Sequence, residues 1–480
     1  MPAEPPNPES QAVTAEHARN SRRLFLAAIV ADAAACAYYG FTARVDDPLQ
    51  LYAGLVIFLL ASLPAILWAR GGGRQLPVFE VLMLTTANCY ALPLLNGHSA
   101  VVRYPPALTL QAALTVILFQ VSALGVYYLL KVRPGRTAFF TREVLADKVN
   151  RYIGYGLTLT SCYTFAALFT DWIPGDLNGI LRAIFYGIGI VAVFVQSRRW
   201  GLGTLGYHEK APFIINAALQ VALQWTTIFL VNGLSVIMLG IVGYVSGSRR
   251  IPFVVIAVSL GTMSLLHNGK FEMRARYWGL SGERKQLQVQ DIPAFYMEWI
   301  ECSLTTNPLT AEEDAPKNKL LDRTSLFHLL CLISSISPDK KPFLGGETYA
   351  GLPAQFVPRF FWPDKPVAHV GTYRLAVYYG LQREEDTVNT TIGFGLLNEA
   401  YANFGVAGAA MIGAFLGGLY KFVQGRCRDS SVVSYAGLGT IVLMAWSFQT
   451  EYTLSMWLSS MYQAAICILG IPFLIRNVLG

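Results

Sequence analysis

Twelve apolar segments of about twenty residues recur along the chain, and short polar stretches separate most of them. An α-helix needs roughly 20 apolar residues to cross the hydrocarbon core of a bilayer, so each segment is a candidate membrane-spanning helix. Two segments are short, which leaves the count uncertain by one or two. The pattern predicts an all-α, polytopic transmembrane helix bundle of about 12 spans. The segments are 24–43, 49–69, 76–95, 107–130, 152–170, 178–196, 213–230, 233–247, 251–267, 405–423, 432–448 and 455–475.

The composition agrees with residence in a membrane. Of 480 residues, 54% are hydrophobic and only 14% are charged, whereas about a quarter of the residues of a soluble domain are charged. Residues 1–23 are rich in Pro, Glu and Asn, which predicts a disordered cytoplasmic tail. The remaining chain then divides into a bundle of about nine helices over 24–267, a large loop over 268–404 and about three helices over 405–480.

Lys and Arg are distributed unevenly between alternate loops. Short cytoplasmic loops retain positive charge, so this distribution predicts the orientation. With the N-terminus inside, the inner loops hold twenty Lys and Arg side chains, whereas the short outer loops hold three: Arg44, Arg103 and Arg182. We therefore expect a bacterial inner-membrane protein with both termini cytoplasmic and the loop 268–404 periplasmic. The net charge of +7 then reflects topology and does not indicate nucleic-acid binding.

Several classes of function lack sequence support. There is no GxxxxGK[ST] motif for nucleotide phosphates and no HExxH or CxxC motif for a metal, so no cofactor is expected. We find no internal repeat of the kind that marks many secondary transporters. Only Cys302 and Cys331 share the long loop, where a disulfide is permitted but not required.

The long loop contains features of a folded segment. Its aromatic and apolar clusters alternate with polar stretches, of which 305–319 is the most linker-like. The run Leu326–Ile336 is too short to span a membrane, so an amphipathic, interfacial or re-entrant helix is expected there. A loop of this length in a compact protein is usually functional or disordered, and its composition favours a function.

A first group of cations, Lys270, Arg274 and Arg276, follows the ninth span in the string HNGKFEMRARYW. If the helix continues, Lys270 and Arg274 share one face. These cations either anchor the chain at the membrane surface, with the aromatic residues beside them, or bind a lipid-linked phosphate.

A second group lies in VPRFFWPDKPVAHVGTYR and contains Arg359, Lys365, His369 and Arg374. Three prolines stiffen this backbone, so it positions side chains without forming regular structure. Bulky aromatics between the charges suggest packing, although a solvated surface loop is the alternative. His369 is either a surface hydrogen-bonding residue or a base.

Two strings in this region resemble a known family. PRFFWPDKP, followed some thirty residues later by GFGLLNEAYANFGVAG, is similar to the loop and helix entry of Wzy-type O-antigen and exopolysaccharide repeat-unit polymerases. PFLGGETY (342–349) also resembles this family, and the resemblance covers about 265–425. The matching positions are Pro358, Arg359, Trp362, Pro363, Lys365 and Pro366, then Gly395, Glu399, Tyr401, Asn403, Phe404 and Gly405.

The resemblance implies a metal-independent membrane glycosyltransferase that needs no nucleotide sugar. Such an enzyme moves a glycan from undecaprenyl pyrophosphate onto the terminal sugar of a second lipid-linked repeat unit at the periplasmic face. A chain-length regulator and a flippase of the same pathway are the implied partners, and the identity of the sugar is not legible in the sequence.

The residue types suit that chemistry. Cations stabilise the negative charge that grows on a departing pyrophosphate, and a base accepts the proton of the attacking hydroxyl. Glu399 is the first candidate for the base and His369 the second, with Arg359 as the main catalytic cation. The expected substrate-binding residues are Lys270, Arg274, Arg276, Lys365, Arg374, Trp362, Tyr401 and Asn403.

Two other functions stay open. An O-antigen ligase differs from the polymerase only in its acceptor, so physical arguments do not separate the two. A lipid-linked oligosaccharide flippase or another transporter would also have about twelve spans, but charged or broken helices near the membrane midplane would then be expected.

Overall fold

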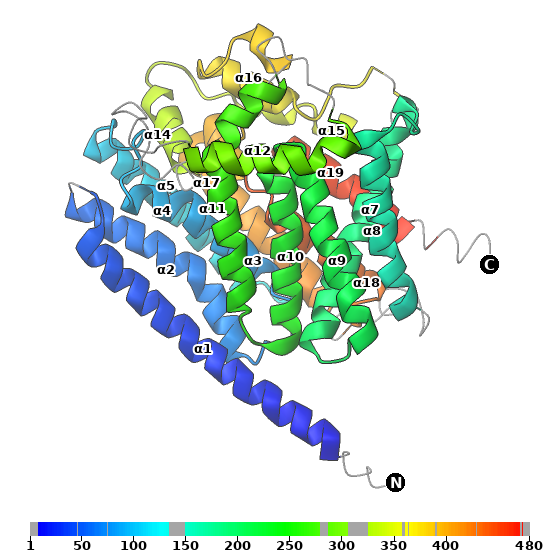
Figure 1. The fold of residues 1–480 in the computed structure, drawn as a ribbon. Helices are drawn as coiled ribbons and strands as arrows, with labels where there is room; N and C mark the ends of the chain where they lie inside the picture. The colour runs from blue at the N-terminus through cyan, green and yellow to red at the C-terminus, as the bar shows by residue number, and fades with distance from the viewer. Residues whose placement is uncertain are drawn as a thin grey trace.

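The computed structural model describes residues 8–480 except 46, 74, 134–148, 279–286, 306–324, 358–360, 363, 389–390, 429, 471–472 and 474–480. All regular secondary structure in the described residues is helical, as Figure 1 shows. The all-α prediction is therefore confirmed for these residues. Arg359, Pro358, Pro363 and most of the predicted linker 305–319 lie outside the described residues.

Long helices make up most of the bundle, and short ones connect them. The helices of twelve or more residues are α1 (Pro8–Thr42), α2 (Pro48–Arg70), α5 (Pro106–Leu129), α7 (Val149–Phe169), α8 (Gly175–Gly201), α9 (Tyr207–Trp225), α10 (Leu230–Ser248), α11 (Phe253–Trp278), α12 (Ile292–Thr305), α17 (Gly395–Arg426), α18 (Tyr435–Ser447) and α19 (Leu454–Ala465). The shorter elements are α3 (Val78–Thr86), η1 (Ala87–Ala91), α4 (Leu92–Leu95), η2 (Val289–Asp291), α14 (Phe327–Ile336), η3 (Glu347–Tyr349), α15 (Leu352–Gln355), α16 (Val370–Tyr378), η4 (Glu384–Val388) and η5 (Ile466–Gly470).

Seven helical segments among the described residues are long and apolar enough to cross a membrane. They correspond to seven of the twelve expected spans, and 153–169, 435–447 and 454–470 form shorter apolar helices at three more. The two other expected spans coincide with α9 and α11. The chain is thus a helical protein with several membrane-spanning candidates, whereas the total of twelve stays a prediction.

Helix α1 begins at Pro8, so residues 8–23 are helical where the composition predicts a disordered tail. The second half of this segment contacts the end of α10. Glu16 pairs with Arg250 at 2.6 Å, and the Asn20 side chain donates to the Ser248 carbonyl at 3.2 Å. Tertiary contacts of this kind are not visible in local composition.

Small residues allow the long helices to approach closely. Gly413 and Gly417 on α17 face the backbone of α5 at Phe119 and Ala123, with no room for a methyl group. On α10, a Cβ at Gly243 would lie 2.7 Å from the Phe194 carbonyl oxygen of α8. Small residues four positions apart serve this purpose in membrane helices, where close backbone packing replaces the hydrophobic effect.

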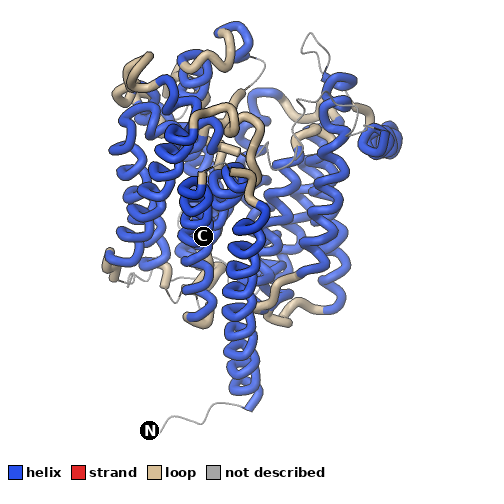
Figure 2. The backbone as a smooth tube through the Cα atoms, turned by 90° about the vertical axis from the view of Figure 1, so that its left-hand side faces the viewer, coloured by secondary structure: helices blue, strands red, loops and turns tan. Residues whose placement is uncertain are grey.

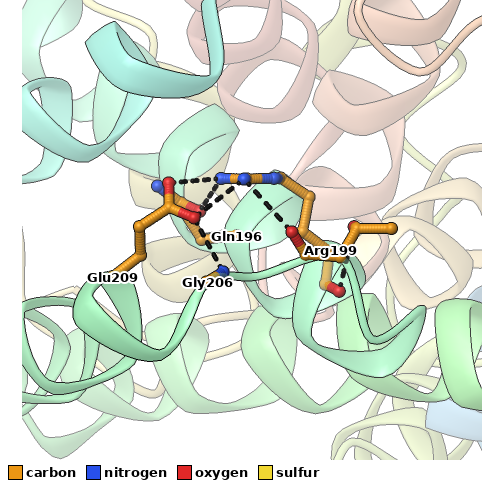
Figure 3. A network of polar contacts seen from close by, with 5 residues as sticks. Gln196, Arg199, Gly206 and Glu209 are labelled. Carbon is orange, nitrogen blue, oxygen red and sulfur yellow. Dashed lines mark hydrogen bonds and ion pairs between the residues drawn. The ribbon is translucent and has the colours of Figure 1, made fainter.

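The turn between α8 and α9 is fixed by the polar network in Figure 3. Arg199 donates to both Glu209 oxygens at 3.0 Å and to Gln196 at 2.9 Å. Glu209 also accepts from the Gly206 amide at 2.8 Å. The turn sequence GLGTLG (201–206) has the spacing of a dinucleotide-binding motif. It joins two helices and follows no strand, so it lacks the structural context for that function.

The short helices of the long loop gather at one end of the bundle, opposite the N-terminus. Figure 2 shows α1 extending past the other helices at the lower end and loops at the upper end. In Figure 1, α12 runs across α9, α10 and α11 near the upper end of the bundle, and α16 lies above the bundle. The expected helix at Leu326–Ile336 is present as α14, with Leu330, Cys331 and Ile333 fully buried.

Two separate hydrophobic clusters form the interior. The larger one joins residues of α2 to α5, α7, α8, α10, α14 and α16 to α19. The smaller one, with Trp225, Met263, Phe295 and Trp299, is made by α9, α11 and α12. Cys331 belongs to the larger cluster and Cys302 to the smaller one, and both are free thiols.

Candidate functional site

Glu399 lies in the first turns of α17, and its side chain is fully buried. Its Oε2 atom accepts a hydrogen bond from the backbone N–H of Leu454 at 2.6 Å. That amide belongs to the first turn of α19, where N–H groups have no partner within their own helix. The Glu399 carboxylate therefore caps the start of α19 from a neighbouring helix.

The second oxygen of Glu399, Oε1, lies beside η3 and the start of α16. The Thr348 hydroxyl is near enough to interact with the carboxylate, but no hydrogen bond of good geometry reaches Oε1. A Cβ at Gly371 would lie 3.6 Å from Oε1 and 3.4 Å from Thr348 Cβ, which are ordinary contact distances, so Gly371 lies directly beside this buried oxygen. Burial, together with the nearby Glu399, raises the pKa of the Tyr349 phenol. Oε1 retains the capacity to accept a proton or a further hydrogen bond.

Helix α16 is tied to α19 at the same place. The hydroxyls of Thr372 and Thr453 lie 3.0 Å apart and are buried, and Thr372 also contacts the Met456 sulfur at 3.4 Å. Three helix ends, those of α16, α17 and α19, thus meet around one carboxylate.

Asn403 joins the start of α17 to the loop 342–349. Its side-chain oxygen accepts from the Gly346 amide at 3.0 Å, and its nitrogen donates to the Thr348 hydroxyl and the Glu399 carbonyl, both at 2.8 Å. Backbone bonds from Leu344 and Gly345 to the α17 segment complete the junction. The strings PFLGGETY and NEAYANFG therefore form one unit, which their separation in sequence does not reveal.

Gly405 and Tyr401 shape the same junction. Gly405 has φ +61° and ψ −143°, and this non-helical residue kinks α17. A Cβ there would lie 2.8 Å from the Phe343 ring. The Tyr401 ring, 1% exposed, packs edge-on against the same Phe343. The predicted glycan-binding residues Tyr401 and Asn403 thus make interior contacts in this structure.

His369 immediately precedes α16 and is two residues from Gly371. Its ring stacks on Tyr373 with a centroid separation of 5.8 Å. Its Nδ1 atom is buried without a hydrogen-bond partner, and burial lowers the pKa of the imidazole. A neutral His369 can accept a proton, although no described contact joins it directly to Glu399.

Lys365 and Trp362 differ in their surroundings. The Lys365 amino group is buried and donates to the Val357 carbonyl at 2.7 Å and the Gln355 carbonyl at 3.3 Å. These bonds close the loop between α15 and α16. Trp362 is 44% exposed and is available to a ligand.

Arg374 forms a two-pronged ion pair with Glu347. The two nitrogen–oxygen distances are 3.1 and 3.2 Å, and both side chains are about half exposed. A guanidinium held this way is oriented for a planar oxyanion and is weakly bound by its partner, because exposed ion pairs contribute little stability. Glu347 lies one residue from Thr348, so Arg374 borders the Glu399 site.

The first group of cations lies elsewhere. Lys270 is buried in α11, and Arg274 stacks on the Trp278 ring at 4.2 Å. Arg276 pairs with Glu298 of α12 at 2.7 Å. Helix α11 packs on α10 and α12 in the smaller hydrophobic cluster, so the described contacts do not join these three cations to Glu399.

Comparison with known proteins gives no matching family model, no matching curated protein and no matching solved structure. Within the described residues, no three His, Cys, Asp or Glu side chains are grouped to hold a metal ion. The chemical capacity of the site rests on the buried Glu399 carboxylate, an imidazole with a lowered pKa and the half-exposed Arg374. The sequence does not mark Gly371 or Leu454 as site residues. Thr348 is marked only because it lies in PFLGGETY, which is similar to the polymerase family.

Proposed function

We propose that this chain is a membrane glycosyltransferase that polymerises undecaprenyl-pyrophosphate-linked oligosaccharide repeat units at the periplasmic face of the bacterial inner membrane. The observation that carries the proposal is the buried Glu399 carboxylate, which is anchored through one oxygen and has no hydrogen bond of good geometry at the other. It lies in the string that resembles the helix entry of the repeat-unit polymerases.

The proposed reaction needs a proton acceptor and a charge stabiliser. A hydroxyl of the acceptor glycan attacks the anomeric carbon of the donor, the bond from that carbon to the pyrophosphate breaks, and the hydroxyl proton passes to the base. Glu399 Oε1 suits the base, with His369 as the alternative. The lipid pyrophosphate leaves with the bonding electrons, so preorganised cations lower the barrier.

Arg374 is the cation best suited to this role among the described residues. Glu347 orients the guanidinium group of Arg374. A phosphate can replace this exposed carboxylate at a small cost in free energy. Arg359 lies in the proline-rich string VPRFFWPDKPVAHVGTYR, which also contains Arg374, and is proposed as the second cation. Lys270, Arg274 and Arg276 are proposed to act farther from the carboxylate, on the lipid-linked phosphate or at the membrane surface.

The distribution of charge supports the proposed orientation. Arg198 and Arg199 lie in the last turn of α8, and Arg250 pairs with Glu16 of α1. Helices α12 and α16 lie at the end of the bundle opposite the N-terminus (Figure 1). Positive charge marks the cytoplasmic side. The Glu399 site then belongs to the periplasmic end, where assembled repeat units are available.

Profiles of lipid-linked glycans in a deletion strain test the proposal. Accumulation of single repeat units, reversed by the wild-type gene, is the expected result. Accumulated long chains would instead identify a ligase, and retention of repeats at the cytoplasmic face would identify a flippase. Arg359→Ala is expected to abolish polymer while leaving protein level and membrane insertion normal, and polymer of wild-type length in that variant would remove Arg359 from the site.

A further inference from the structure

A half-open cavity of about 410 Å³ lies between α7, α8, α9, α10, α18 and α19. Amides, hydroxyls and one guanidinium line part of it, and apolar side chains line the rest. Polar side chains within apolar spans are costly to bury and are functional candidates by default. Those that matter most here are Arg182, Tyr186, Gln220, Asn232, Gln449 and Gln463.

The side-chain oxygen of Gln220, which lines this cavity, accepts no hydrogen bond from a neighbouring residue. The residue is 3% exposed, and its amide nitrogen donates to the Thr164 hydroxyl at 3.1 Å. Its oxygen, Oε1, is buried and has no hydrogen-bond partner. Buried polar atoms are almost always paired, so this oxygen indicates a ligand group that donates a hydrogen bond, such as a hydroxyl.

Arg182 is an exposed residue at the edge of this cavity and gives its lining a positive charge. No Asp or Glu appears among the described lining residues. A cation among neutral amides and hydroxyls favours an anionic head group that also carries hydroxyls. A phosphate attached to a sugar meets both requirements.

An apolar groove of about 920 Å³ adjoins this half-open cavity. It lies between α8, α9, α10, α11 and the start of α12, and almost all of its lining is hydrocarbon. Val193 of α8 and Val236 of α10 line both spaces, so the two spaces lie next to each other with these side chains between them. On α11 the groove extends from Pro252 to Leu266, which is about 21 Å at 1.5 Å per residue and suits one extended hydrocarbon chain.

We propose that the cavity and the groove together bind one polyprenyl phosphate lipid, with the phosphate-bearing head at Arg182 and Gln220 and the chain in the groove. This inference rests on the proposed function and assigns a site to its carrier lipid. Gln449 and Tyr452 of the cavity lining precede Leu454, whose amide binds Glu399, so the head would lie close to the α18–α19 turn that also carries the carboxylate contact.

Binding of undecaprenyl phosphate to the full-length protein in phosphatidylcholine nanodiscs tests the site. Arg182→Gln is expected to weaken binding about tenfold or more, because it removes the charge, whereas Arg182→Lys retains most of it. Ala218→Phe, which adds a ring at an exposed position of the groove, is expected to weaken binding to a similar degree. Arg103→Gln and Leu219→Phe are matched controls outside both spaces and should bind as the wild type does.

Competing ligands distinguish the source of the phosphate. Phosphatidylglycerol and inorganic phosphate are expected to compete poorly with undecaprenyl phosphate, since inorganic phosphate has no chain for the groove and phosphatidylglycerol has two. Equal competition by either would overturn the proposal, as would unchanged binding in both Arg182→Gln and Ala218→Phe.

The outcomes separate this inference from the proposed function. If the deletion strain accumulates single repeats but Arg182→Gln and Ala218→Phe bind the lipid normally, the polymerase stands and this site is wrong. If lipid binding depends on both residues but glycan profiles are unchanged by the deletion, the site stands and the polymerase is wrong. Thermal unfolding of each variant confirms that a loss of binding is not a loss of fold.

Discussion

The Glu399 carboxylate and the backbone amide of Leu454 are joined by a 2.6 Å hydrogen bond that ties the start of α17 to the start of α19. This bond gives Glu399 a structural role in addition to the proposed chemical one. The N-cap residue of α19, Thr453, makes no side-chain capping bond, so Glu399 supplies what the local sequence does not. Substitutions of different shape and charge separate the two roles.

Glu399→Gln is expected to abolish polymer formation with little change in thermal stability. The amide oxygen of Gln can still accept from Leu454, but it cannot take a proton from an acceptor hydroxyl. Glu399→Ala removes the partner of a buried amide and is expected to cost about 1–3 kcal/mol of stability. Glycan profiles and thermal unfolding of the purified protein measure the two effects. Glu385→Gln, an exposed carboxylate of the same loop, is the control, and normal polymer in Glu399→Gln would exclude Glu399 as the base.

Asn403→Ala is expected to destabilise the protein by about 1–3 kcal/mol, because it leaves the half-buried Gly346 amide without its acceptor and removes the buried bond to Thr348. Polymer formation should fall along with stability, since the η3 turn beside Glu399 loses its attachment. Asn216→Ala is the matched control, because Asn216 bonds only to the Pro212 carbonyl of its own helix. Equal unfolding temperatures for the two variants would contradict the role given to Asn403.

Gly405→Ala is expected to cost about 1–3 kcal/mol, since φ +61° with ψ −143° is a region open essentially to glycine alone. The added methyl group would also press on the Phe343 ring at 2.8 Å. Gly418→Ala in the same helix provides the comparison, because the nearest atom to its Cβ is Val126 Cγ1 at 3.6 Å. Thermal unfolding of both variants tests this requirement for glycine. A Gly405→Ala protein as stable as Gly418→Ala would show that the kink is dispensable.

The sequence predicts the positions of most helices because their apolar segments set both length and register. The segment 107–130, for example, matches α5 at Pro106–Leu129 to within one residue at each end. The apolar pattern does not predict helical residues whose helix extends beyond the apolar segment. The helical residues before 24 include Glu16 and Asn20, which meet the end of α10 in a contact between positions more than 200 apart.

The candidate site shows the same division. Its carboxylate was predictable, because Glu399 lies in a recognisable string at a helix entry. Its surroundings were not, since Thr348, Gly371 and Leu454 come from three distant segments and each contributes a backbone feature or a small group. Residue type predicted Lys365 as a phosphate ligand, but its amino group bonds to two carbonyls of its own loop, a choice that depends on backbone conformation.

Lys365→Met is expected to lower stability, whereas Arg374→Gln is expected to affect polymer formation with little change in stability. Lys365→Met leaves two carbonyls without their donor in a buried position and should lower stability by about 1–3 kcal/mol. Arg374→Gln breaks a half-exposed ion pair and should change stability by at most about 1 kcal/mol. If Arg374 binds the pyrophosphate, polymer is lost while the unfolding temperature is kept. Glu347→Gln breaks the same ion pair without removing the cation, so retained polymer in that variant assigns the loss to the guanidinium.

His369 makes stability depend on pH in a defined direction. Burial lowers the pKa of the folded-state imidazole below its ordinary value of about 6.5, so the unfolded chain binds a proton more readily than the folded one. The contribution of His369 to stability is therefore fully present above about pH 6.5 and is lost as the pH falls below that value. Thermal unfolding at pH 8 and pH 5 should show a larger decrease for the wild type than for His369→Asn, which cannot take up the proton. The exposed His208→Asn is the control and should decrease as the wild type does, whereas the same decrease in His369→Asn would show that the imidazole is not held neutral by its surroundings.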